Sequence, residues 1–73
     1  MSAAEEIASY MNSGLTTGYN CSYYAYASGN KVILQLEKDS SGDWLLVEDY
    51  MREVFNDQNS EYGYACSFRV EYY

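Results

Sequence analysis

"KVILQLEK", Lys31 to Lys38, is the most regular pattern in the chain. Val32, Leu34 and Leu36 alternate with polar residues, and only Ile33 breaks the alternation. A period of two is typical of a β-strand with one buried face. Such a strand needs a second layer to cover its apolar side, so the flanking segments decide the architecture.

The preceding residues predict a helix and a partner strand. Ser2 to Asn12 carries apolar residues at three- and four-residue spacing, and Ser2 with Glu5 fits a capping box. "YNCSYYAYAS", Tyr19 to Ser28, is rich in aromatic residues and predicts a strand. The turn signal "SGN" joins it to Lys31–Lys38, which predicts a hairpin.

After the break "DSSGD" at 39–43, the segment "DWLLVEDYMREVFNDQ" has two interpretations. In the first it is one long helix capped by Asp43, with Leu45 alone on the wet side. In the second, "WLLV" is a third strand and a shorter helix starts near Glu48. Both keep residues 49–57 helical. The long helix places these side chains on one apolar stripe: Trp44, Val47, Tyr50, Met51, Val54 and Phe55.

Gly63 to Tyr73 predicts a last strand, so the element order is α-β-β-α-β in one domain of 73 residues. We expect an α+β fold of two layers. A right-handed crossover would place the last strand beside the first, in a three-stranded antiparallel sheet of order 2-1-3 with both helices on one face. In that register Cys21 and Cys66 lie near opposite ends of the strand pair, too far apart for a disulfide, so both thiols are expected to be free.

The composition bounds the function. A hydrophobic content of 48% suffices for a core, and the chain shows neither a membrane-length apolar run nor a secretion signal, so we expect a cytoplasmic protein. The net charge of −7 disfavours nucleic acid and anionic membranes as direct partners and favours a basic protein surface.

No catalytic, cofactor or metal site is evident, so we expect a protein that is not an enzyme. The chain has no histidine, which excludes the usual serine and cysteine catalytic pairs. It lacks a glycine-rich phosphate loop, and "DSSGD" lacks the spacing of a calcium loop.

Most of the negative charge lies in one segment. Residues 37–61 hold eight acidic and two basic residues, which accounts for six of the seven net charges. Asp49, Glu53 and Asp57 recur every four residues and Glu61 continues the register, so on a helix they form an acidic ridge with a charge every ~6 Å. Glu48 with Arg52 is the one favourable pair of this spacing. Two interpretations stay open: solubility, or mimicry of phosphates in a nucleic-acid groove.

The short acidic chain without catalytic equipment, with ten tyrosines, resembles the small anti-CRISPR and other anti-defence proteins of phages. The resemblance is one of general character and rests on no motif. It implies a stoichiometric inhibitor of a CRISPR effector or other nuclease complex, which would block nucleic-acid binding or a required movement.

The tyrosines divide between two faces of the predicted sheet. Tyr24 and Tyr26 point outward, and Tyr73 lies outward on the last strand. Outward tyrosines either lie across their strand neighbours or serve as anchors for a partner. The residues assigned to the inner face include Tyr19, Cys21, Tyr23, Tyr64, Cys66, Phe68, Val70 and Tyr72.

We therefore expect a binding protein that engages a basic, nucleic-acid-handling partner. The partner-binding candidates are Glu48, Asp49, Glu53, Asp57, Glu61, Tyr24, Tyr26 and Tyr73. Two alternatives share these features: a structural protein whose tyrosine face pairs two copies, and an acidic antitoxin or immunity protein.

Overall fold

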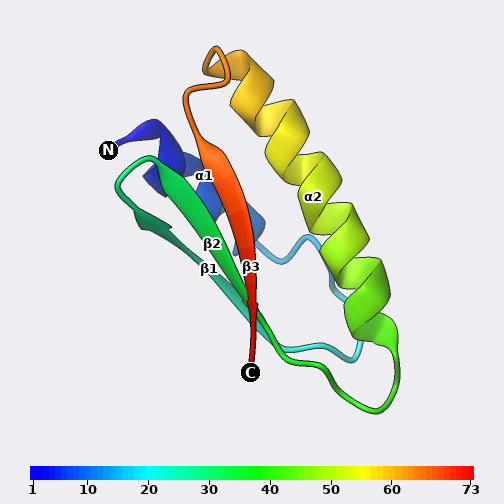
Figure 1. Ribbon diagram of the computed structural model, residues 1–73. Helices are drawn as coiled ribbons and strands as arrows, with labels where there is room; N and C mark the ends of the chain where they lie inside the picture. The colour runs from blue at the N-terminus through cyan, green and yellow to red at the C-terminus, as the bar shows by residue number, and fades with distance from the viewer.

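The computed structural model describes all residues, 1–73, and has the predicted element order (Figure 1). The two helices and three strands are α1 (Ala3–Met11), β1 (Tyr23–Ser28), β2 (Lys31–Leu36), α2 (Asp43–Glu61) and β3 (Ser67–Tyr72). The α+β class is confirmed. Neither helix combines the length and apolarity that a bilayer crossing requires.

The predicted strand order is wrong. The sheet has the order β1-β2-β3, with β1 antiparallel and β3 parallel to β2, so it is mixed and β2 is central. The outer edge of β1 is blocked to another strand at its middle, because the Asn12 side chain donates to Ala25 O at 2.7 Å and accepts from Ala25 N at 2.9 Å. The 19 residues of α2 supply the crossover that a parallel connection needs.

One core lies between the helices and one face of the sheet (Figure 1). β2 contributes Val32, Leu34 and Leu36, which confirms the alternation in its sequence. Ile33 points to the opposite face, yet only 3% of it is exposed. It stands in register between Tyr26 and Arg69, so residues on the two flanking strands cover it. The helices contribute Ala4, Ile7, Ala8, Met11, Val47, Met51, Val54 and Phe55 to the core.

Two strands begin later than predicted. β1 starts at Tyr23, and the chain before it turns at Gly18, whose φ is 101°. β3 starts at Ser67, after Gly63 and Tyr64 adopt positive φ angles of 67° and 60°. Tyr19 and Tyr64 are therefore exposed, and their predicted inward positions are wrong.

The long-helix interpretation of residues 43–58 is right, and "WLLV" is not a strand. The predicted cap is wrong, since the helix begins after Gly42, whose φ is 82°, and Gly42 has no side chain to cap it. The Asp43 carboxylate instead accepts from Asn20 N at 2.8 Å and ties the loop before β1 to the start of α2. Leu46 is 55% exposed, as is Leu45, so Leu45 is not alone on the wet side.

The helix at the N-terminus starts as its sequence indicates. Ser2 accepts from Glu5 N at 3.2 Å, and Glu5 accepts from Ser2 N at 2.9 Å, which completes the capping box. These hydrogen bonds hold the pKa of the Glu5 carboxyl below its ordinary value, chiefly through the bond from the Ser2 backbone N–H.

The two cysteines are free, as expected. The predicted placement near opposite ends is confirmed, and the observed strand order separates the thiols further. Cys21 precedes β1 and Cys66 precedes β3, and these strands are the two edges of the sheet with β2 between them. Because β1 runs antiparallel to β2 and β3 runs parallel to it, the thiols also lie near opposite ends of the sheet.

Candidate protein-binding surface

The acidic ridge of Asp49, Glu53, Asp57 and Glu61 lies wholly within α2, and all four side chains are exposed. The ion pairs of the molecule are Arg52–Glu48 and Arg69–Glu71, so no ridge carboxylate has a basic partner. Four like charges spaced one helical turn apart repel one another. The ridge is therefore a concentrated and uncompensated negative surface.

A shallow cleft between the two helices adjoins this ridge. Tyr10 of α1 and Tyr50 of α2 are about half exposed, and Glu53 and Asp57 lie beside them. Val54 and Gln58 complete the lining. A lysine or arginine side chain can pack its cation over the face of an aromatic ring and pair with a carboxylate at the same time. We call this feature the α1–α2 cleft.

Sequence reasoning missed Tyr10 and misplaced Tyr50. The spacing predicts Tyr50 on the apolar stripe, but it lies at the margin of that stripe and is 42% exposed. Tyr10 belongs to the first helix, and its position beside Tyr50 depends on how α1 packs against α2. The i to i+4 spacing of Leu46 and Tyr50 was the one available signal of an apolar strip beside the ridge.

Glu48 is not part of the acidic ridge. It lies on the other flank of α2, its side chain is 15% exposed, and it forms an ion pair with Arg52 at 3.2 Å. It also accepts a hydrogen bond from the Tyr72 hydroxyl, which raises the pKa of Tyr72 above its ordinary value. This carboxylate joins α2 to β3 and is engaged within the chain.

The predicted outward tyrosines lie on the open face of the sheet, on the opposite side from the helices. The Tyr24 and Tyr26 rings stack with centroids 6.3 Å apart. The Tyr26 hydroxyl donates to Glu71 at 3.2 Å, so this ring spans the sheet over Ile33. Tyr24 and Tyr73 are more exposed, at 57% and 65%. A flat partner cannot contact this face and the acidic ridge together, because the sheet separates them.

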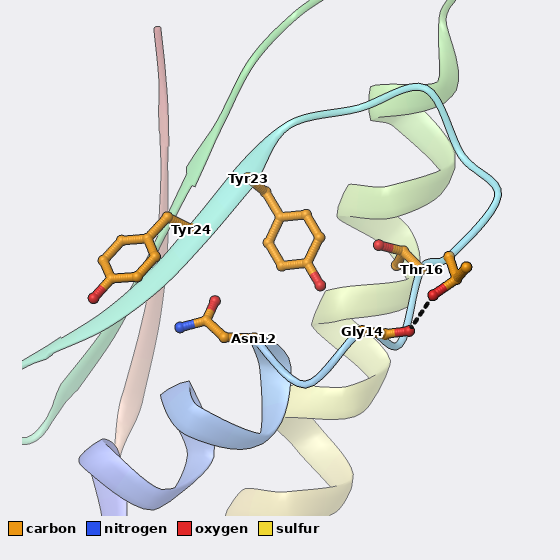
Figure 2. A pocket seen from close by; sticks show the side chains of 6 residues that line it. Asn12, Gly14, Thr16, Tyr23 and Tyr24 are labelled. Atoms are coloured by element: carbon orange, nitrogen blue, oxygen red, sulfur yellow. Dashed lines mark hydrogen bonds between the residues drawn. The ribbon is translucent and has the colours of Figure 1, made fainter.

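A second hollow lies where the chain leaves α1 (Figure 2). It is lined by Asn12, Gly14, Thr16, Thr17, Tyr23 and Tyr24. Thr17 donates to Gly14 O at 2.8 Å, and the Tyr23 hydroxyl donates to Met11 O at 2.7 Å. Its lining includes no charged side chain. These polar groups hold the loop and β1 together.

No group of three or more histidine, cysteine or acidic side chains is placed to hold a metal ion. The Cys21 thiol lies near Glu37, Asp39 and Asp43, and burial with these carboxylates raises its pKa above the ordinary value. A raised pKa lowers the thiolate fraction and so the reactivity of this cysteine.

The chain matches no family model, and no curated protein or solved structure is significantly similar to it. Its function is therefore inferred from its own residues and their geometry.

Proposed function

We propose that this protein is a stoichiometric inhibitor of the anti-CRISPR kind, which docks through α2 on a basic surface of a nucleic-acid-handling protein. The supporting observation is the unpaired acidic ridge beside the α1–α2 cleft. The ridge occupies a surface that otherwise binds phosphates, and the partner is thereby kept from its nucleic acid. A CRISPR effector or another nuclease complex in the host cytoplasm fits this description.

The α1–α2 cleft gives the contact an anchor. A lysine or arginine of the partner enters between the Tyr10 and Tyr50 rings and pairs with Glu53 or Asp57. Aromatic and arginine side chains dominate the binding energy of many interfaces, whereas exposed charges mainly steer the encounter. The ridge thus supplies orientation and association rate, and the cleft supplies the residence time.

The test starts with capture of partners from a bacterial lysate on the immobilised protein, followed by affinity measurements with the captured protein. Glu53→Lys should weaken binding about 100-fold or more, because it reverses a charge at the centre of the ridge. Glu37→Lys is the matched control, since Glu37 is also exposed but follows β2 outside the ridge, and its affinity should change little.

Two further measurements separate ridge from cleft. Tyr50→Ala should speed dissociation with little effect on association. Asp49→Lys changes a ridge residue outside the cleft lining, and it should slow association and flatten its salt dependence. Equal affinities of the wild-type and Glu53→Lys proteins would overturn the proposal. A captured partner that loses affinity with Tyr24→Ser and not with Glu53→Lys would assign binding to the open face instead.

A further inference from the structure

β3 presents an open strand edge. Ser67 N donates to Asn30 O and Tyr73 N donates to Leu36 O, so the odd-numbered residues of β3 bond to β2. Backbone groups of alternate residues point to opposite sides of a strand. The N–H and C=O groups of Phe68, Val70 and Tyr72 therefore point away from the sheet, at the edge seen beside α2 in Figure 1.

The two edges of the sheet differ in how they are protected. On β1, Asn12 binds both backbone groups of Ala25 at the middle of the strand. On β3 the equivalent contact is made by Asn59, which binds both backbone groups of Cys66 at 3.0 Å, before the strand begins. The edge of β1 is thus blocked at its centre, and that of β3 is open over its whole length. Open edges of this kind pair with other strands.

The side chains along β3 are self-complementary. In an antiparallel pair of two β3 strands centred on Val70, each Arg69 stands opposite the other copy's Glu71 on the open face of the sheet. Arg69 and Glu71 bond to each other at 2.7 Å within one chain, and both are partly exposed, so the pairs can exchange across the dyad. Phe68 stands opposite the other copy's Tyr72 on the inner face.

The hydrogen-bonding positions agree with this register. Centring on Val70 pairs outward backbone groups with outward backbone groups, which is the hydrogen-bonded arrangement of an antiparallel ladder. A dyad at residue 69 places Arg69 opposite its own copy, and a dyad at residue 71 places Glu71 opposite its own copy. Like charges directly opposite each other are destabilising, so the charges favour the dyad at Val70 over these two registers.

The flank of α2 above β3 repeats the pattern. Arg52 lies over the Phe68 ring at 5.5 Å, and Glu48 accepts from Tyr72, so the midpoint of this Glu48–Arg52 pair stands level with Val70. The same dyad therefore brings Glu48 of each copy toward Arg52 of the other. Both arginines of the chain lie along this one edge, each with a carboxylate at the symmetry-related position.

We infer that two copies of the chain associate through antiparallel β3 strands, forming a continuous six-stranded sheet about a dyad at Val70. Closed two-fold symmetry pairs the same patch on both subunits, which is the self-complementarity seen here. The acidic ridge faces away from β3, so the dimer carries two ridges on its helical side. The interface is independent of the proposed partner-binding surface.

The test is a charge swap measured by sedimentation equilibrium. Arg69→Glu should weaken the dimer at least about ten-fold, since it places acids opposite acids in both symmetric pairs. Lys31→Glu is the matched control: it makes the same charge change at an exposed residue of the central strand, and the dimer should persist. The double variant Arg69→Glu with Glu71→Arg restores opposite charges in the same register and should restore association.

Two further measurements accompany sedimentation equilibrium. Circular dichroism establishes that each variant is folded, and amide hydrogen exchange of the Val70 N–H should slow as protein concentration rises. A wild-type protein that stays monomeric at millimolar concentration would overturn the inference. So would a dimer that Arg69→Glu and Lys31→Glu weaken equally, that the double variant leaves dissociated, or that Tyr24→Ser dissociates through the open face.

Discussion

Glu53→Gln should stabilise the protein while weakening its binding surface. Glu53 lies four residues from both Asp49 and Asp57 on α2, and no basic side chain pairs with it. A like-charge pair at this spacing costs about 0.2–0.5 kcal/mol, so removing two such pairs raises the free energy of unfolding by about 0.4–1.0 kcal/mol. Glutamine and glutamate have nearly the same helix propensity, so that term does not interfere.

The assay is thermal and urea unfolding followed by circular dichroism at low salt. A gain of this size raises the Tm of a domain of 73 residues by about 2–8 °C. In 1 M salt the screening length falls to about 3 Å, and the gain should disappear. The matched control is Glu48→Gln on the opposite flank of the same helix.

Glu48→Gln should have the opposite sign. It removes the ion pair with Arg52 and turns a charge-assisted bond with Tyr72 into a neutral one, a loss of about 0.5–1.5 kcal/mol. A lower free energy of unfolding for Glu53→Gln, or an effect of the same size in 1 M salt, would show that charge repulsion along the ridge does not destabilise α2.

Three further predictions concern the rest of the molecule. Asn59→Ala should lower the free energy of unfolding in urea by about 2–4 kcal/mol, because it leaves both backbone groups of Cys66 without partners; a loss below about 1 kcal/mol would contradict this role. Stability should fall as the pH rises above about 10. A tyrosine whose pKa is raised in the folded state keeps its proton at a pH where the unfolded chain has lost it, so the folded protein binds more protons than the unfolded chain. The three tyrosines that donate to carboxylates are Tyr26, Tyr62 and Tyr72, and replacing them with phenylalanine should make the free energy of unfolding fall less steeply above this pH. An unchanged slope in denaturation measured across the pH range would exclude these tyrosines as its source. Alkylation of the unreduced, denatured protein should add two groups by mass spectrometry, and in the folded protein Cys21 should react more slowly than an ordinary exposed thiol; a mass that shows no added group would indicate a disulfide.

Short-range patterns predicted most of the elements. The capping box of Ser2 and Glu5, the alternation in Lys31–Lys38 and the long helix after Asp43 are all present. Each depends on neighbours within four residues, which a periodicity reports directly. The errors at Tyr19 and Tyr64 have a common cause, since aromatic residues favour strands but the chain at both places is held in a turn next to a glycine.

The candidate surface was predictable only in part. The acidic ridge follows from i to i+4 spacing alone, because every α-helix places such residues on one line. The engagement of Glu48 by the Tyr72 hydroxyl and the place of Tyr10 in the cleft depend on contacts between segments far apart in the chain. No local pattern contains that information.

The class of fold, the helical ridge and its charge follow from local period and composition, so they can be predicted without a structure. The position and direction of β3 depend on long-range packing, which no local pattern reports. From the sequence pattern alone, β3 could pair with either edge of the β1–β2 hairpin. On the β1 edge the Asn12 side chain binds the backbone N–H and C=O of Ala25, and α2 is long enough to return the chain along the β2 edge. That choice leaves the Val70 edge free, and with it the surface on which two copies of the chain are proposed to meet.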